Sequence, residues 1–180
     1  MKEIEVKILE IDKQKIEKTL IDLGSEKVFD GHIKTYFLDF QDGSIVKAKN
    51  VLRLRKEKGK TELTYKKVHV TQTAKQAEEY SVEVSDLEEM KKILENLGLE
   101  VTESMEKHRV SYTLEHAQFD IDCYLDNYEY IPEFLEIEAE NIDLIYKYAN
   151  LLGFRNDDCL PWSTTELIQH YSFLKVKTGK

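Results

Sequence analysis

The sequence has few of the features that mark secreted and membrane proteins. Its 180 residues include only two cysteines, Cys123 and Cys159, too few for a disulfide-stapled extracellular fold. No apolar run approaches the ~20 residues that a membrane helix needs. Met1 is followed directly by a predicted strand, which leaves no room for a signal peptide. These absences predict a reduced, soluble, cytoplasmic protein with no membrane partner.

The chain also lacks an excess of positive charge. The chain has 26 lysines and arginines against 35 aspartates and glutamates, and a net charge of −9. Non-specific nucleic-acid binding depends on clustered lysine and arginine, so we expect no nucleic-acid partner. A small anionic ligand stays possible, because the local field in a cleft matters more than the total charge. The sequence has no glycine-rich phosphate loop and no metal-ligand spacing of histidines, so side chains would have to hold any phosphate.

Apolar residues make up 41% of the chain, which is enough for one core, and we expect a single domain over residues 1–180. Three segments share one helical design, with a polar cap at the start, apolar residues at helical spacing and a Leu-Gly end. They cover residues 12–24, 86–98 and 141–153.

The remaining sequence is dominated by segments that alternate apolar and polar residues, as strands do. The two prolines interrupt none of them, and the short turns imply antiparallel pairing. A sheet of about eight strands tends to curl or close. The predicted strands cover residues 3–7, 34–40, 51–56, 61–68, 79–84, 107–112, 119–124 and 135–138.

The helices must bury their apolar stripes, and the apolar faces of the strands are the available partner. The charged faces would then point inward. We therefore expect an α+β fold in which an eight-stranded antiparallel β-barrel encloses a charged lumen and the helices pack outside. The predicted inward positions are Glu3, Glu5, Lys7, Arg53, Arg55, Lys66, Glu79, Glu83, Lys107, Arg109, Asp122, Glu136 and Glu138.

This charged set favours a particular ligand chemistry, because buried charges must be satisfied by pairing, water or ligands. Guanidinium and ammonium groups on neighbouring strands are suited to a polyphosphate. Carboxylates without nearby histidine or cysteine suit a hard cation such as Mg²⁺ or Mn²⁺. Bases and acids in one lumen therefore predict a metal–polyphosphate complex as the ligand.

Glu3-x-Glu5-x-Lys7 resembles the signature of the CYTH superfamily, the triphosphate tunnel metalloenzymes. Further elements follow in the order of that family, and the resemblance extends over essentially the whole chain. These elements are Leu52-Arg53-Leu54-Arg55, Leu63-Thr64-Tyr65-Lys66, the acidic strand at residues 79–83, Lys107-His108-Arg109 and Phe134-Leu135-Glu136-Ile137-Glu138.

The resemblance implies an eight-stranded tunnel that binds a triphosphate with one or two divalent cations. It implies that Lys7 is catalytic and lies near the reacting phosphorus, where it assists either the nucleophile or the leaving group. The metal ligands it implies are Glu3, Glu5, Glu136 and Glu138. The phosphate-binding residues it implies are Arg53, Arg55, Lys66, Lys107 and Arg109.

Two features of the resemblance leave alternatives open. Residues 119–124 resemble the hydrolase-like members and favour Asp122 as the functional aspartate, whereas residues 125–127 resemble the cyclase-like members and favour Asp126; we prefer Asp122. In the middle acidic strand Ser81 stands where an acid is expected. The roles of the two acids that flank it, Glu79 and Glu83, therefore stay open.

The leading functional hypothesis is a metal-dependent triphosphatase, in which water attacks the terminal phosphorus of inorganic, thiamine or nucleoside triphosphate. The alternative is a class IV adenylyl cyclase, in which the ribose 3′-hydroxyl attacks the α-phosphorus and pyrophosphate leaves. A second alternative is a non-catalytic binder of polyphosphates or nucleotides. Monomer and homodimer both stay open.

Overall fold

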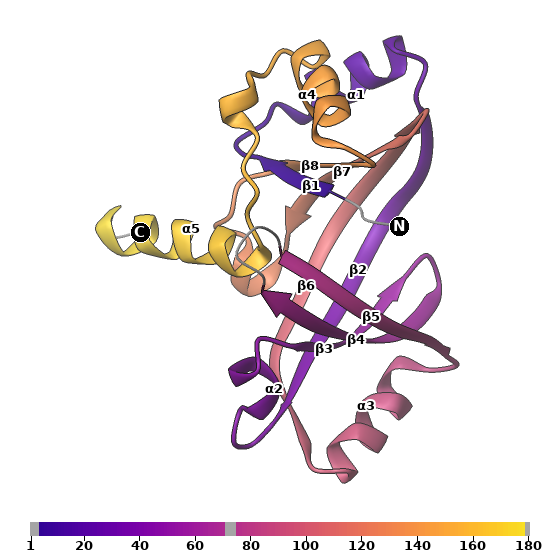
Figure 1. Cartoon of the computed structure of the whole chain (residues 1–180), viewed down its shortest axis with the longest axis vertical. Helices are drawn as coiled ribbons and strands as arrows, with labels where there is room; N and C mark the ends of the chain where they lie inside the picture. Colours follow the sequence, from indigo (N-terminus) through magenta and orange to yellow (C-terminus); the bar gives the residue numbers. More distant parts are fainter. Residues whose placement is uncertain (1–3, 71–74, 179–180) are drawn as a thin grey trace. The chain divides into compact units, whose positions relative to one another are not determined.

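The computed structural model describes residues 4–70 and 75–178, with backbone alone at 68–70, 75–77 and 175–178 (Figure 1). The chain forms two compact units, which are described separately below. Unit 1 comprises Met1–Gly31 and Lys107–Lys180, and unit 2 comprises His32–Glu106. The prediction of one domain over the whole chain stays a prediction.

The fold is α+β, and its described strands form one eight-stranded antiparallel sheet in the order β1-β8-β7-β6-β2-β3-β4-β5. This confirms the predicted class, while closure into a barrel stays a prediction. The strands are β1 (Ile4–Ile8), β2 (Glu26–Phe40), β3 (Val51–Glu57), β4 (Lys60–Val70), β5 (Lys75–Val84), β6 (Leu99–Leu114), β7 (Ala117–Tyr124) and β8 (Phe134–Ala139). The helices are α1 (Lys13–Asp22), α2 (Ser44–Lys47), α3 (Leu87–Asn96), α4 (Ile142–Leu151) and α5 (Thr164–Thr178), with short 3₁₀ turns η1 (Asp126–Tyr128) and η2 (Asn156–Asp158).

The three predicted helices, α1, α3 and α4, are confirmed together with the signals that start and stop them. At each start a polar side chain accepts a hydrogen bond from a backbone N–H of the first turn. The caps are Asp12, Asp86 and Asn141. Each helix is followed by a glycine at positive φ, which lets the chain turn back at little cost.

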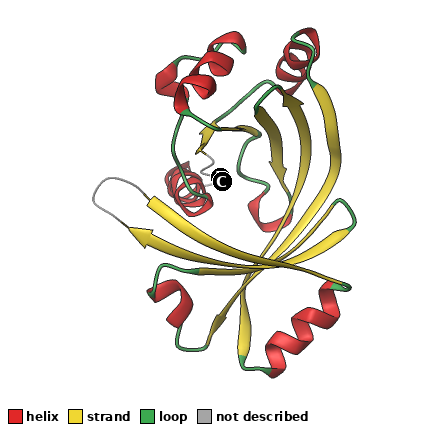
Figure 2. Ribbon diagram, turned by 45° about the vertical axis from the view of Figure 1, so that its right-hand side comes forward, coloured by secondary structure: helices red, strands yellow, loops and turns green. Residues whose placement is uncertain are grey.

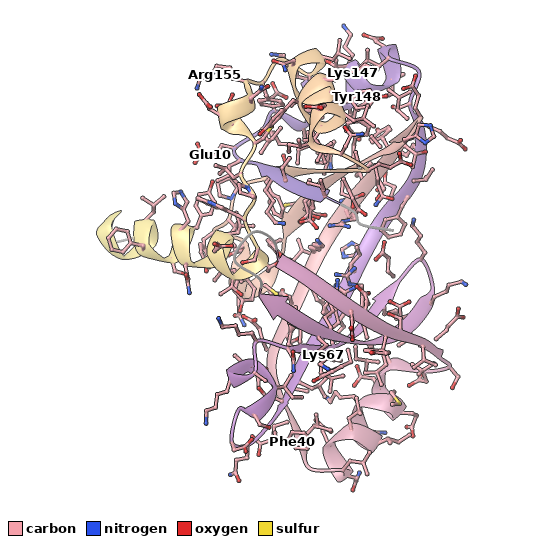
Figure 3. The ribbon with its side chains drawn as sticks, viewed as in Figure 1. Glu10, Phe40, Lys67, Lys147, Tyr148 and Arg155 are labelled. Atoms are coloured by element: carbon pink, nitrogen blue, oxygen red, sulfur yellow. The ribbon has the colours of Figure 1, made fainter. Side chains whose placement is uncertain are left out.

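Unit 1 buries the apolar faces of its strands against α1 and α4 (Figures 1 and 2). Leu20 of α1 and Ile145 of α4 are completely buried, as is Phe119 of β7. Tyr148, labelled in Figure 3, packs edge-on against Phe119 with ring centroids 5.2 Å apart. Each large apolar side chain buried in this way stabilises the fold by about 1.5–3 kcal/mol. The strand face opposite these helices is the charged one, as predicted.

Unit 2 repeats this design with α3. Leu87 and Leu94 of this helix belong to one buried cluster with Tyr36 of β2 and Leu54 of β3. Leu54 alternates with Arg53 and Arg55, so both arginines lie on the strand face opposite the apolar cluster.

Two features of the fold differ from the expectations. Strands β2 and β6 begin well before the predicted residues 34 and 107, and both extend from one unit into the other. The C-terminal helix α5 was not predicted, because its apolar residues do not gather on one helical face. Within the part of the chain that the structure describes, none of the helices combines the length and the apolar character needed to cross a bilayer.

Candidate functional site

The charged face of unit 1 is assembled by antiparallel register. Lys7 of β1 lies opposite Glu136 of β8, and Arg109 of β6 lies opposite Asp122 of β7. Because side chains alternate along each strand, these four groups share one face. The register thus joins charged residues from four neighbouring strands into one cluster.

Arg109 is the most heavily bonded member of this cluster. Its Nε and Nη2 donate to the two oxygens of Asp122, each at 2.6 Å, and its Nη1 donates to Asp120 at 2.5 Å. Nη2 also donates to Glu136. Burial lowers the pKa of this guanidinium, but the three carboxylates outweigh burial and raise it above its ordinary value. Charge-assisted hydrogen bonds contribute about 1.5–3 kcal/mol each, so this arrangement is strongly held.

Lys7 is almost completely buried, with 2% of its side chain exposed. Its Nζ lies 2.9 Å from Glu136 Oε1 and also bonds Glu5. Burial lowers the pKa of Lys7, but Glu136 and Glu5 raise it above its ordinary value, so the amine stays protonated. The backbone of Lys7 exchanges two hydrogen bonds with Leu160, of 2.8 and 2.9 Å, which fixes this part of β1.

Three neighbouring basic side chains determine the protonation state of Glu136. Burial raises the pKa of this carboxyl, but Lys107, Arg109 and Lys7 together hold it far below its usual range. Glu136 is therefore a carboxylate at every physiological pH, and its two oxygens accept from Lys7 and Arg109 respectively.

The structure places Asp122, and not Asp126, in the cluster. Asp122 is completely buried and accepts from Arg109 and from Lys107, whose Nζ also lies 5.7 Å from the ring centre of Tyr124. Asp126 is exposed at the start of η1. The geometry thus brings the aspartate of the hydrolase-like motif into the charged face.

Sequence reasoning missed Asp120 as a site residue. It is 4% exposed, and its Oδ2 accepts from Arg109 and from Gln118 Nε2 at 3.0 Å. Burial raises the pKa of Asp120, although Arg109 opposes this. The available signal was its strand parity, because Asp120 and Asp122 are two residues apart and must share a face.

The charged face of unit 2 is more loosely paired. Arg53 Nη2 lies 3.6 Å from Glu79, and Arg55 Nη1 lies 3.5 Å from Glu57. Lys66 makes the shorter contact, 2.8 Å from Glu79. Burial and the adjacent Arg55 lower the pKa of Arg53 to about 10. The two guanidinium groups therefore repel each other without a carboxylate held firmly between them.

The Nε atoms of Arg53 and Arg55 are buried, and among the described residues neither has a hydrogen-bond partner. Buried donors are normally satisfied, so two unsatisfied donors on adjacent positions of one face indicate a binding site for an acceptor. An anion with several oxygens would satisfy both donors and offset the repulsion between the arginines.

Ser81 and its neighbours form a hydrogen-bonded group that is connected to Arg53 and Lys66 through Glu79. Thr64 Oγ1 bonds Glu62 at 3.0 Å and Ser81 Oγ at 3.1 Å. Ser81 in turn donates to Glu79 at 3.4 Å. Glu62, which sequence reasoning did not select, has the same strand parity as Lys66. Glu83 instead pairs with exposed Lys60 at 3.0 Å.

The family model described as the CYTH domain matches residues 1–144. The chain belongs to this family. A Methanocaldococcus jannaschii protein named "Putative adenylate cyclase MJ0240" is 29% identical over 144 residues, 80% of each protein. The structure of PH1012 from Pyrococcus horikoshii OT3 is 25% identical, with a TM-score of 0.73 over 92% of this chain and 99% of that one. HpAC1 from Hippeastrum, for which a dominant triphosphatase activity is reported, shares the fold at 13% identity, with a TM-score of 0.62 over 99% of this chain and 95% of its own.

CYTH proteins bind triphosphate substrates and generally use divalent metals. The carboxylates of this chain are therefore considered as ligands of a divalent metal. Glu3 lies outside the described residues, Glu5 is about half exposed, and Glu138 lies opposite Glu5 in the β1–β8 register. These oxygen donors fit a hard divalent cation. Across residues 4–70 and 75–178, however, no three acidic, histidine or cysteine side chains are grouped as an ion would require.

Proposed function

We propose that this chain is a divalent-metal-dependent triphosphatase, in which water attacks the terminal phosphorus of a bound triphosphate. The observation that carries the proposal is the pair of buried, unsatisfied Nε donors on Arg53 and Arg55. A triphosphate supplies oxygen acceptors and negative charge at the spacing of neighbouring side chains, which a simple monoanion does not. Membership of the CYTH family supports the same ligand class.

In this proposal Arg53, Arg55 and Lys66 are phosphate-binding residues of unit 2, and the same role is proposed for Lys107 and Arg109 of unit 1. Lysine contributes a compact charge, whereas each arginine presents a planar fork. Removing Lys66 should therefore weaken binding without abolishing it.

The metal, Mg²⁺ or Mn²⁺, would be held by glutamate oxygens, and when bound it would neutralise negative charge on the phosphates. The glutamates proposed for this role are Glu3, Glu5, Glu136 and Glu138. Glu5 is about half exposed and bonds Lys7, whereas Glu136 is held by both Lys7 and Arg109.

Lys7 is proposed to act near the reacting phosphorus as a cation. Its contacts with Glu136 and Glu5 raise the pKa of the amine, which favours the protonated form over the neutral form that a general base needs. A protonated amine can instead stabilise the charge that develops on the leaving oxygen. Asp122 is proposed to hold the Lys107 side chain in place through their ion pair.

An adenylyl cyclase is the second candidate, and the name of the Methanocaldococcus jannaschii relative favours it. The two reactions need the same triphosphate site but attack different phosphorus atoms. The placement of Asp122, and not Asp126, in the charged cluster favours the hydrolase.

The deciding experiment is to incubate the protein with Mg²⁺ or Mn²⁺ and, separately, inorganic triphosphate, thiamine triphosphate and ATP, and to resolve the products. We expect orthophosphate and no cyclic nucleotide. Cyclic AMP with pyrophosphate would replace the hydrolase by the cyclase. Triphosphate binding that needs no metal and gives no turnover would identify a non-catalytic binder.

Glu5→Gln tests the metal assignment within this proposal. We expect turnover to be lost while the circular dichroism spectrum stays unchanged, because Glu5 is exposed and its loss leaves the core intact. Glu140→Gln is the matched control, since it removes one exposed carboxylate just beyond β8. Full activity of Glu5→Gln would remove Glu5 from the metal set.

A further inference from the structure

Helix α5 is apolar on two faces. On one face Leu167 and Tyr171 are buried, and the hydroxyl of Tyr171 donates a hydrogen bond to Glu10 at 3.2 Å. On the other face Phe173 and Leu174 are 59% and 39% exposed. A helix that is apolar on all sides is normally buried on all sides. The exposed face of α5 therefore has the composition of a contact surface.

The exposed face is lined by residues that recur three or four positions apart, so they lie along one side of the helix. We call it the outer face of α5. Its described residues, which line an open hollow, are Trp162, Glu166, Gln169, His170, Phe173 and Leu174. The rings of Trp162 and His170 lie 5.0 Å apart. Within the described part of the chain this one segment lines the hollow, and a second helix laid along it would supply the opposite wall.

The rest of α5 is fixed to unit 1. The hydroxyls of Ser172 and Tyr130 are hydrogen-bonded at 2.9 Å, and at the start of the helix Glu166 accepts from the backbone N–H of Ser163 at 2.8 Å. Figure 1 shows the C-terminal half of α5 extending away from the strands of unit 1. A surface that is ordered before binding loses little conformational entropy when a complex forms. The outer face of α5 is therefore preorganised for a partner.

The charges of α5 favour a second copy of this chain as that partner. Glu166 lies in the first turn of the helix, and the sequence places Lys175 and Lys177 in the last turn. Two antiparallel copies bring the acidic start of each helix beside the basic end of the other, and their helix dipoles are opposed. An anionic membrane fits less well, because the outer face contains Glu166 and the chain has a net charge of −9.

We propose that two copies of this chain form a dimer through the outer faces of α5, packed antiparallel about a two-fold axis. The spacing makes the face self-complementary, as a two-fold interface requires. When His170 lies opposite Phe173 of the second copy, Glu166 lies opposite the position of Lys177 of the second copy. A helix of 15 residues is only about 22 Å long, so we expect a small interface and a dissociation constant on the order of micromolar. The inference does not depend on the proposed function.

Phe173→Lys tests the interface by sedimentation equilibrium of the full chain, without ligand. The wild type should change from monomer to dimer between about 1 and 100 µM, the range in which a micromolar dimer dissociates. Phe173→Lys should raise the dissociation constant roughly a hundredfold or more, because the dimer loses two apolar contacts and gains two charges. A wild type that stays monomeric over this range would overturn the proposal.

A control variant shows whether the effect belongs to α5. Leu151→Lys introduces the same charge at a side chain of α4 that is 48% exposed, and it should keep the dissociation constant of the wild type. Equal weakening by the two variants would place the interface elsewhere and overturn the proposal. Circular dichroism checks that each variant is folded. If Phe173→Lys does not fold, Phe173→Ala makes the same decision, because it removes the ring without adding a charge.

A mixing experiment tests the antiparallel orientation. His170→Glu and Phe173→Lys should each be monomeric alone, since either variant places an unpaired charge against an apolar ring. An equimolar mixture should form a heterodimer, because antiparallel packing sets the new glutamate of one copy opposite the new lysine of the other. In a parallel pair position 170 faces position 170, and no such ion pair forms. A mixture that stays monomeric while the wild type dimerises would overturn the antiparallel arrangement.

Discussion

Units 1 and 2 share the same arrangement of strands and helices, but their charged side chains are paired differently. In both, the apolar strand faces pack against helices and the charged faces lie opposite. In unit 1 the guanidinium of Arg109 is surrounded by three carboxylates, with contacts of 2.5–2.6 Å to the two aspartates. In unit 2 the ion pairs of Arg53 and Arg55 are 3.6 and 3.5 Å long, and both Nε atoms stay unsatisfied in the described structure.

The difference shows that strands in which charged and apolar residues alternate can form two kinds of charged face. Where opposite charges meet across the strands, they neutralise each other and form a rigid network. Where like charges are adjacent, as in Arg53 and Arg55, the repulsion is left for a ligand to relieve. The first arrangement fixes the positions of its own side chains, so that removal of one partner is costly, and the second is the proposed phosphate-binding site.

Arg109→Met should give the largest effect on stability. Loss of this cation leaves three buried carboxylates uncompensated, and breaking a buried pair in this way costs about 3–5 kcal/mol. Arg53→Met, in contrast, removes a partly desolvated charge that repels Arg55, and we expect a change within about 1 kcal/mol. The measurement is urea unfolding followed by circular dichroism. Equal losses of unfolding free energy in the two variants would mean that the charged faces of the two units contribute equally to stability.

Lys66→Ala should weaken binding of inorganic triphosphate by roughly tenfold to a hundredfold, because one charge-assisted hydrogen bond of about 1.5–3 kcal/mol is lost. Stability should change little, since the Lys66 side chain is 31% exposed. Isothermal titration calorimetry measures the affinity. Unchanged affinity would remove Lys66 from the phosphate-binding residues.

Acidification should destabilise unit 1 through Glu136. The pKa of Glu136 in the folded protein is lowered from the ordinary 4.5, so its contribution to stability is complete above pH 4.5 and is lost as the pH falls. Each pH unit of that window corresponds to about 1.4 kcal/mol. Asp120 acts in the opposite sense, because its raised pKa costs stability as the pH rises from 3.8.

The measurement is the free energy of unfolding as a function of pH for the wild type and Glu136→Gln. The variant should show a shallower loss on the acid side. Parallel curves for the two proteins would mean that Glu136 is not the group responsible.

Glu83→Ala should give the smallest effect. Its ion pair with Lys60 is 3.0 Å long, but the two side chains are 62% and 71% exposed. Exposed pairs of this kind contribute about 0.2–1 kcal/mol, and less at high salt. Thermal unfolding at low and high salt checks this. A loss as large as that of Arg109→Met would show that the edge of unit 2 is also a rigid network.

Much of the site could be predicted because strand geometry alone assigns residues to faces. Alternation placed Lys7, Arg53 and Lys66 opposite the apolar cores, and the structure agrees. The pairing partners could not be predicted in the same way. Asp120 and Asp122 have identical parity, and only the register across β6, β7 and β8 brings Asp120 to Nη1 of Arg109.

The sequence by itself determined the eight strands, the helices α1, α3 and α4 with their caps, and the apolar and charged faces, because these depend on local periodicity and on backbone preferences within a few residues. The tertiary structure decided which charges neutralise one another. That outcome depends on the distances between side chains on strands far apart in the chain, and the energy of an ion pair changes steeply with distance and burial. Arg53 and Arg109 therefore look alike in the sequence, while one has an unsatisfied Nε in the described structure and the other is held by three carboxylates.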